Sequence, residues 1–172
     1  MVSYEVVTIN FMVYEGKNRF AGAASVQLPN INQKTVNLSG AGIAGDVEVP
    51  ISGQLEAMEV SIKFNEFSAE VARLRSPGRH TITLMPAVQR GDKTKGEIVT
   101  VPEKHTMVIV PKGLSGANIA PATQRESTLT ASVRYWKYTV DGKTVHEIDP
   151  MNHIFIINGV DHGKAVRKAL GL

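Results

Sequence analysis

The sequence predicts a mainly β protein, an antiparallel β-sandwich or barrel with one or two short helices packed against it. Apolar and polar residues alternate with a period of two along most of the 172 residues, which is typical of strands with one buried face. Turn residues such as Gly16-Lys17-Asn18 and Asp141-Gly142 separate these stretches. Helical spacing covers roughly a tenth of the chain, well below the usual third.

In the first half, strands are expected over 4–14 and 22–28, followed by a polar, glycine-rich loop over 30–53. Residues 58–64 alternate between apolar side chains and Glu59, Ser61 and Lys63, which predicts a strand with one buried and one polar face. Asn65 is the expected cap of a short helix, because Phe67, Val71 and Leu74 recur at helical spacing. Pro77-Gly78 ends this helix.

In the second half, a strand over 80–90 is expected to break at Gly91-Asp92 and to pair with a strand over 97–110. Pro102 places a bulge or a sheet edge within the second of these strands. Residues 111–127 show no periodicity and are expected to form a long loop. A hairpin over 127–148 turns at Asp141-Gly142. A strand over 153–157 then leads to a last helix, from an Asp161 cap to Leu170, with Gly171 as its stop.

Composition favours one domain over residues 1–172 that folds in a reducing compartment. The chain is 42% hydrophobic and contains no cysteine, so a packed core is expected, without a disulfide framework or thiolate metal sites. The start of the chain lacks a basic-then-apolar run, so no secretory signal is expected. No apolar run exceeds four residues, so no transmembrane helix and no membrane insertion are expected.

The net charge of +3 does not by itself indicate a nucleic-acid-binding protein. The basic residues are scattered and are not interleaved with aromatic residues in the manner of a base-stacking groove. Lys164, Arg167 and Lys168 do cluster. They lie in the predicted C-terminal helix, where they complement the negative end of the helix dipole.

Two motifs suggest ligands but lack the context that such ligands need. Gly40-Ala41-Gly42-Ile43-Ala44-Gly45 matches G-x-G-x-x-G, but no helix or βαβ unit follows, so the glycines are interpreted as a loop that packs against another backbone. His146, Glu147, Asp149 and His153 could ligate a metal. On a strand His146 and Glu147 point to opposite faces, so convergence is not expected. No G-x-S-x-G motif occurs, and neither a cofactor nor an active site is predicted.

Tyr135, Trp136 and Tyr138 lie on one predicted strand, with Trp136 and Tyr138 on the same face. They could form a base-stacking or sugar-binding platform. The favoured interpretation is an aromatic face buried in the core or against a neighbouring subunit.

Two blocks of sequence carry a family resemblance. The first comprises Asp141-Gly142, Val145, Glu147-Ile148-Asp149, Asn152, Asn158-Gly159-Val160-Asp161 and Gly171-Leu172. The second comprises Leu28-Pro29, Gly40-Ala41-Gly42 with Gly45, and Leu55-Glu56-Ala57-Met58-Glu59. In order and spacing they resemble the major tail tube proteins of contractile-tailed bacteriophages and phage-tail-like bacteriocins. Residues 65–127 match only in general character.

The resemblance implies a fold shared with type VI secretion tube proteins, and a structural role without enzymatic activity. Hexameric rings would stack into a hollow tube that conducts DNA or punctures a target envelope. The implied partners are further copies of the chain, a tail sheath protein, a tape-measure protein and a baseplate or tail initiation complex, with DNA passing without specific binding. The implied location is a virion tail or bacteriocin particle, assembled in the host bacterial cytoplasm.

Unpaired sheet edges explain how such a domain could polymerise, because neighbouring copies can pair the edges that a monomer leaves open. The loop over 29–53 is expected to become ordered against the next ring. Its expected contact residues are Gly40, Gly42, Ile43, Gly45 and Asp46.

A conduit for a polyanion should be neutral to acidic. Glu56 and Glu59 are therefore candidate lumen carboxylates, and Lys164, Arg167 and Lys168 are expected on the outer wall, facing a sheath. The alternative function is a β-sandwich module that binds carbohydrate or protein.

Overall fold

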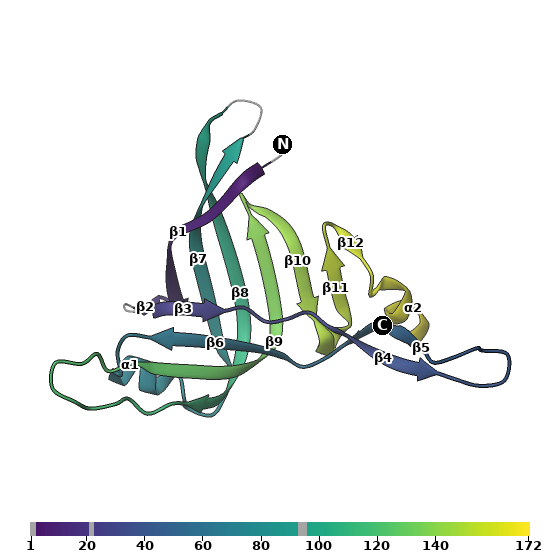
Figure 1. The fold of residues 1–172 in the computed structure, drawn as a ribbon, viewed down its shortest axis with the longest axis horizontal. Helices are drawn as coiled ribbons and strands as arrows, with labels where there is room; N and C mark the ends of the chain where they lie inside the picture. Colours follow the sequence, from purple (N-terminus) through teal and green to yellow (C-terminus); the bar gives the residue numbers. More distant parts are fainter. Residues whose placement is uncertain (1–2, 21–22, 93–95) are drawn as a thin grey trace.

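Two long strands, β8 (Ile98–Leu114) and β9 (Ser127–Val140), run through both layers of the fold (Figure 1). The computed structural model describes residues 3–20, 23–92 and 96–172. β8 and β9 pair with each other from Glu103 opposite Val140 to Leu114 opposite Leu129. On the other side of β9, the first half pairs with β6 (Met58–Phe64) and the second half with β10 (Lys143–Asp149). The sheet therefore divides at β9 into two layers.

The upper sheet in Figure 1 joins β8, β9 and β10 to strands from both ends of the chain. β1 (Ser3–Glu15) pairs with β7 (His80–Asp92), and β7 pairs with β8. On the far side, β11 (Ile154–Ile157) pairs with β10, and β12 (Val160–Asp161) pairs with β11. The three-residue β2 (Asn18–Phe20), which was not predicted, pairs with the end of β1.

The lower sheet contains β3 (Ala23–Gln27), β6, the first half of β9 and the end of β8. The core lies between the two layers. β6 shows the predicted alternation, since Met58, Val60, Ile62 and Phe64 are buried while Glu59 faces outward. From the upper sheet, Ile82, Leu84, Met107, Ile109, Trp136 and Ile148 complete the same hydrophobic cluster. The predicted mainly β sandwich with short helices is confirmed.

Helix α1 (Ala69–Arg73) packs on the core through Val71 and Leu74, both fully buried. The predicted cap, Asn65, was wrong: Ser68 caps the helix, and its Oγ accepts a hydrogen bond from the amide of Val71. Residues 66–68 are still irregular, so the helix begins later than predicted and Phe67 remains outside it, 40% exposed. A cap must precede the first helical residue directly, which Asn65 does not.

Helix α2 (Lys164–Leu170) ends at Gly171, which adopts the left-handed conformation at φ +76° as predicted. Its predicted cap was wrong, because Gly163 occupies the N-cap position without a side-chain hydrogen bond. Asp161 instead ends β12, and its carboxylate accepts a hydrogen bond from the Gly163 amide. A one-turn 3₁₀ helix, η1 (Pro150–Asn152), joins β10 to β11.

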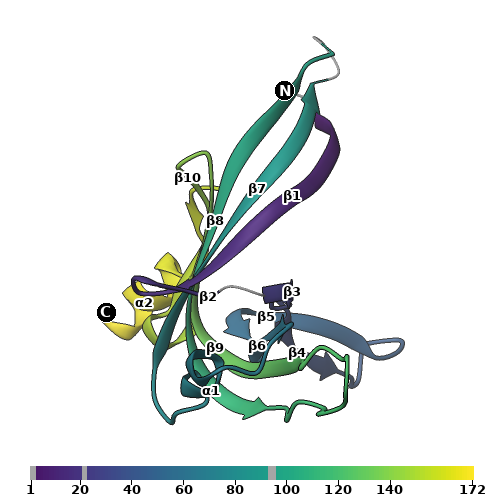
Figure 2. The same cartoon turned by 90° about the vertical axis from the view of Figure 1, so that its left-hand side faces the viewer.

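The largest correction concerns the predicted loop over 30–53. It contains a two-stranded sheet of β4 (Gln33–Leu38) and β5 (Val47–Leu55), which projects away from the sandwich (Figures 1 and 2). The glycines and polar residues concealed an alternation in which Val36 pairs with Val49 and Leu38 with Val47. Cross-strand apolar pairs favour a hairpin.

Two smaller corrections concern β7 and β8. Gly91-Asp92 belongs to β7 and does not interrupt it, and β8 continues to Leu114, so the loop predicted over 111–127 is reduced to 115–126. Pro102 lies at an edge as expected. Strand pairing of β8 with β9 begins only at Glu103, so at Pro102 the strand pairs with β7, and on the other side the Pro102 carbonyl accepts one hydrogen bond from the Asp141 amide of the β9–β10 turn.

Candidate assembly surfaces

The β4–β5 hairpin presents an exposed apolar face that the sandwich does not cover. Val36, Leu38, Val47, Val49 and Ile51 are each 38–48% exposed. The opposite face is polar, and Thr35 Oγ1 donates to Glu48 Oε1 at 2.7 Å. A two-stranded hairpin is marginal in water by itself, and an exposed apolar surface of this kind usually marks an interaction site. The hairpin is therefore the first candidate interface.

The predicted contact residues Gly40, Gly42, Ile43, Gly45 and Asp46 all lie at the tip of this hairpin, in the turn that joins its two strands. Ile43 is 42% exposed, and its amide donates to the Gly40 carbonyl. Gly42 has φ +91°, a conformation that favours glycine, and a Cβ added there would meet no atom within 4 Å. β5, not a helix, follows the glycines. This is a turn and not a nucleotide-binding loop.

A second exposed apolar region, which we term the blade, extends beyond the sandwich (Figure 2). It is formed by the start of β1, the end of β7 and the start of β8, where Ser3 pairs with Asp92 and Gly91 with Ile98. Val6, Ile9 and Ile98 are more than half exposed. The sequence prediction missed the blade because these residues were assigned to ordinary strands. The consecutive pairs Val6-Val7 and Ile98-Val99 were the available signal, since adjacent strand residues face opposite sides and cannot share one core.

The lower sheet has unpaired edges on both sides. Among the described residues, β3 pairs with β6 alone, and the end of β8 beyond Ile109 pairs with β9 alone. β1 similarly has β7 on one side, while β2 covers only Val13–Glu15 on the other. Open edges carry amide and carbonyl groups that can pair with another chain.

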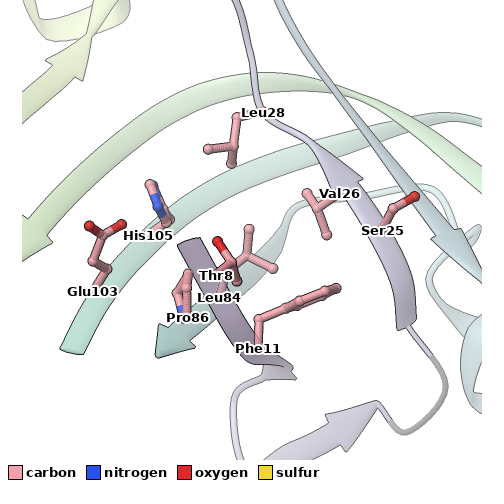
Figure 3. Close-up of a pocket in the computed structure, with 9 residues that line it drawn as sticks. All are labelled: Thr8, Phe11, Ser25, Val26, Leu28, Leu84, Pro86, Glu103 and His105. Atoms are coloured by element: carbon pink, nitrogen blue, oxygen red, sulfur yellow. The ribbon is translucent and has the colours of Figure 1, made fainter. Parts of the chain in front are cut away.

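A cavity of about 340 Å³ opens beside the free edge of β3 (Figure 3). Phe11, Val26, Leu28, Leu84 and Pro86 form most of its lining. Thr8, Ser25, Glu103 and His105 complete the lining, with the Ser25 hydroxyl directed away from the other residues (Figure 3). It is lined by β1, β7 and β8 of the upper sheet and by β3 of the lower sheet. The cavity therefore lies between the two sheets.

The two candidate lumen carboxylates lie close together in the chain but in different settings. Glu59 lies on the outward face of β6, where its carboxylate forms an ion pair with Lys112 of β8. Glu56 lies in the connection between β5 and β6, and its Oε2 accepts a hydrogen bond from Asn32 Nδ2 at 3.1 Å.

The three basic residues expected to face a sheath are all on α2, but one of them is engaged within the subunit. Arg167 pairs with Asp161 and donates to the His153 carbonyl at 2.7 Å. The hydrogen bond from Arg167 lowers the pKa of the Asp161 carboxyl. Lys164 and Lys168 are exposed and remain candidates for an intermolecular contact.

Trp136 and Tyr138 share the core face of β9, as predicted, and their rings contact two buried histidines. Trp136 is 5% exposed and its Nε1 donates to His105 Nδ1 at 3.3 Å. The His105 ring stacks on Tyr138, and His146 packs edge-on against Trp136. Burial lowers the pKa of His105 to about 4, an effect that Glu103 opposes and His146 reinforces, and burial also lowers the pKa of His146. The aromatic strand is therefore part of the core and not an exposed platform.

His146 and Glu147 face opposite sides of the sheet, as predicted. Glu147 accepts a hydrogen bond from the Tyr135 hydroxyl at 2.9 Å and pairs with Lys137 on the outward face. Within residues 3–20, 23–92 and 96–172, no three His, Asp or Glu side chains gather in an arrangement that could hold a metal ion. Within these same ranges, no helix is long and apolar enough to cross a membrane.

Comparison with known proteins identifies relatives over nearly the whole chain. The family described as phage tail tube protein FII matches residues 7–171. The tail tube protein of Escherichia phage P2 is 28% identical over 170 residues, covering 96% of this chain and 94% of that protein. The match thus includes the middle segment, where the sequence resemblance was weakest.

Solved structures share the fold at low sequence identity. A chain from the sheath–tube complex of the extracellular contractile injection system PVC, in its extended state, superposes with a TM-score of 0.55 at 14% identity, covering 79% of this chain and 92% of that one. A chain from the tube-terminating cap of the anti-feeding prophage gives a TM-score of 0.52 at 16% identity, covering 81% and 93%.

Proposed function

Because the chain belongs to the phage tail tube protein FII family, and is thus a structural tube subunit, we propose that six copies close into a ring and that rings stack into a hollow tube. The tube conducts DNA or punctures a target envelope. The single observation that carries this proposal is the family match over residues 7–171. The uncovered hairpin, blade and sheet edges support it, because each is a surface that a partner would bury.

Ring closure uses the lateral edges of the lower sheet. The free edge of β3 and the free end of β8 bound the same four-stranded sheet on opposite sides. Joining one edge to the other in the next copy continues the sheet around the ring, which is a heterologous contact that closes on itself. The cavity beside β3 then lies at the ring contact, where the neighbouring copy covers its apolar lining.

Stacking uses the hairpin, which we propose reaches from one ring to the next. Its tip residues Gly40, Gly42, Ile43, Gly45 and Asp46 form the inter-subunit contact, and its apolar face becomes buried there. In the free subunit the hairpin opens readily, because two strands alone supply little burial. The neighbouring ring holds it closed. Since stacking does not close on itself, the tube has open length.

The remaining partners follow from the position of the tube within a contractile particle. The outer wall meets a sheath, with exposed Lys164 and Lys168 as contact residues, while Arg167 acts indirectly by fixing α2 to Asp161. The tube starts on a baseplate or initiation complex and contains a tape-measure protein. Glu56 and Glu59 belong to the lumen side. Residues 1–172 act as one domain, without enzymatic activity or membrane insertion, and assemble in the bacterial cytoplasm before entering the tail.

The test is electron microscopy of the purified chain in negative stain, at increasing concentration, with light scattering in parallel. Six-membered rings or tubes support the proposal. A stable monomer at all concentrations, which also fails to form tubes when a tail initiation complex is supplied, overturns it. The alternative of a sugar-binding module predicts a sugar-dependent change in Trp136 fluorescence. The burial of Trp136 in the core argues against that module.

A further inference from the structure

The outward face of the lower sheet, which we term the polar facet, differs in composition from the apolar face of the hairpin and from the blade. Strand pairing places its residues on one side, because Ser25 lies opposite Lys63, Ser61 opposite Thr130, and Glu59 opposite Ser132. The facet consists of small hydroxyl or amide side chains and two pairs of opposite charges. Its members are Ser25, Gln27, Glu59, Ser61, Lys63, Lys112, Glu126, Thr128, Thr130 and Ser132.

Each lysine of the polar facet is paired with a carboxylate of the facet. Lys63 Nζ lies 2.9 Å from Glu126 Oε2. Lys112 Nζ pairs with Glu59 Oε2 across from β8 to β6. The charges of the two pairs cancel, so the members named above have a net charge of zero although the chain as a whole carries +3. Arg134, which is exposed, follows Val133 at the register shift of β9 and adds, at the border of the facet, a positive charge that neither pair compensates.

The outward face of the upper sheet has a different character. Met12 and Met85, which lie opposite each other on β1 and β7, are 39% and 44% exposed. Tyr135 also faces outward there, with its hydroxyl bonded to Glu147. Large apolar and aromatic side chains of this kind adhere to partners. The polar facet carries small polar groups and compensated charges, with Val110 of β8, opposite Ser132, as an apolar member at its border, and its sheet is open at both edges.

We propose that the polar facet is the wall of the bore, and that Glu59 and Glu126 mask Lys112 and Lys63 from the phosphates of passing double-stranded DNA. This inference rests on the proposed function. Each lysine that neutralises a phosphate adds to a salt-dependent affinity. Repetition around every ring would turn one free lysine per subunit into a continuous basic lining that holds DNA. A masked pair leaves the polyanion free to slide.

The position of the facet can be tested directly, because the chain contains no cysteine. Ser61→Cys and Thr130→Cys place single thiols on the polar facet, and Thr81→Cys places one on the outward face of the upper sheet. Assembled tubes are treated with a small maleimide and with a maleimide carried on a protein too large to enter the bore. Thiols on the facet should react with the small reagent alone. The thiol of Thr81→Cys should show no such preference for the small reagent over the bulky one. Reaction of Ser61→Cys and Thr130→Cys with the bulky reagent in intact tubes overturns the assignment.

The masking can be tested with charge variants matched in net charge. Glu59→Gln frees Lys112 in the facet, while Glu70→Gln makes the same charge change on exposed α1. Co-sedimentation of short duplex DNA with tubes is measured across a salt series. At low salt, Glu59→Gln tubes should retain at least about tenfold more DNA than Glu70→Gln tubes. The amount of DNA that they retain should also fall more steeply as the salt concentration rises. Lys112→Gln tubes should retain no more DNA than tubes of the unaltered protein.

Each result distinguishes the inference from the function on which it rests. Failure of the unaltered chain to form rings or tubes overturns the proposed function. Tubes that form normally, but in which Glu59→Gln retains no more DNA than Glu70→Gln, overturn the masking alone. Glu126→Gln provides an independent repetition through Lys63. If Glu59→Gln fails to assemble, this second pair tests the same proposal.

Discussion

Strands β6 and β5 follow similar alternations of apolar and polar residues, but the apolar side chains of β6 are buried and those of β5 are exposed. In β6, Val60, Ile62 and Phe64 are fully buried. In β5, Val47, Val49 and Ile51 remain 38–48% exposed, because among the described strands β5 pairs with β4 alone and no second sheet covers this face. The same pattern therefore stabilises the subunit in one place and, in our account, the assembly in the other. The comparison predicts that substitutions in β6 lower the stability of the subunit, whereas substitutions in β5 impair tube assembly.

The largest effect is expected in the core. Phe64→Ala should destabilise the subunit by about 3–5 kcal/mol, because it removes a buried ring and leaves a cavity. Val49→Ala in the hairpin should change the free energy of unfolding by under about 0.5 kcal/mol. Urea denaturation of both variants, under conditions that keep the protein monomeric, measures the difference. Equal losses would mean that the hairpin is as much a part of the folded core as β6.

The buried histidines predict a pH dependence that belongs to the sandwich and not to the hairpin. Burial lowers the pKa of His105 to about 4 in the folded state, while the unfolded chain takes up the proton near pH 6.5. Between these values the unfolded state binds more protons. Stability should thus be complete above pH 6.5 and fall, by up to about 3 kcal/mol, as the pH approaches 4.

Denaturation midpoints across this pH range test the histidine effect. His105→Gln retains an acceptor for the Trp136 indole but cannot titrate, so its curve should be flatter than that of the unaltered protein. His162→Gln is the control, because His162 is exposed. Carboxylates titrate alike in all three proteins. A His105→Gln curve parallel to the control would remove His105 as the cause.

A smaller effect on stability is expected at the hairpin tip. Gly42→Val meets no steric obstacle but forces a β-branched residue to φ +91°, at a cost of about 1–2 kcal/mol confined to the turn. The subunit should remain folded by circular dichroism, while tube formation should be lost because the contact residues are displaced. Gly45→Val is the companion variant, at φ +149°. Normal assembly of both variants, or unfolding of either, would contradict a contact role for the tip.

The smallest effect on the subunit should accompany one of the largest on assembly. The double substitution Val36→Ser and Val49→Ser removes one exposed cross-strand apolar pair of the hairpin. Its unfolding free energy should change by under about 1 kcal/mol, while the concentration needed for tube growth should rise at least tenfold. The matched control, Thr35→Ser with Glu48→Gln, alters the polar face of the same strands. Equal losses of assembly from both faces would show that the apolar face has no special role.

The sequence predicted the sandwich because its strands obey local rules. The β9–β10 hairpin was located correctly from Asp141-Gly142 and the alternation on either side. The family resemblance, and with it the structural role, also came from residues such as Asn158-Gly159-Val160-Asp161. Helix caps were harder to place. Asn65 and Asp161 are both favourable cap residues, and the choice of Ser68 and Gly163 depends on where the chain turns in space.

The interfaces could be predicted only in part. Hairpin β4–β5 was interpreted as a loop, because its alternation is weak and its tip is rich in glycine, yet the predicted contact residues lie together at that tip. The pairing of Arg167 with Asp161 was not visible, since both residue types are ordinary on a surface helix. The polar facet needed the strand register, which brings Glu59 of β6 next to Lys112 of β8, 53 residues later.

Hydrogen exchange on the free subunit and on assembled tubes tests the central claim most directly, since it compares β6 and the hairpin in one experiment. In the subunit, amides of β4 and β5 should exchange quickly, because two exposed strands open by local fluctuations. Amides of β6 should exchange slowly. In tubes the hairpin amides should become protected at least a hundredfold, while those of β6 change little. Hairpin amides that exchange equally fast in both states would contradict the account, because the surface left uncovered by the fold would then remain uncovered in the assembly.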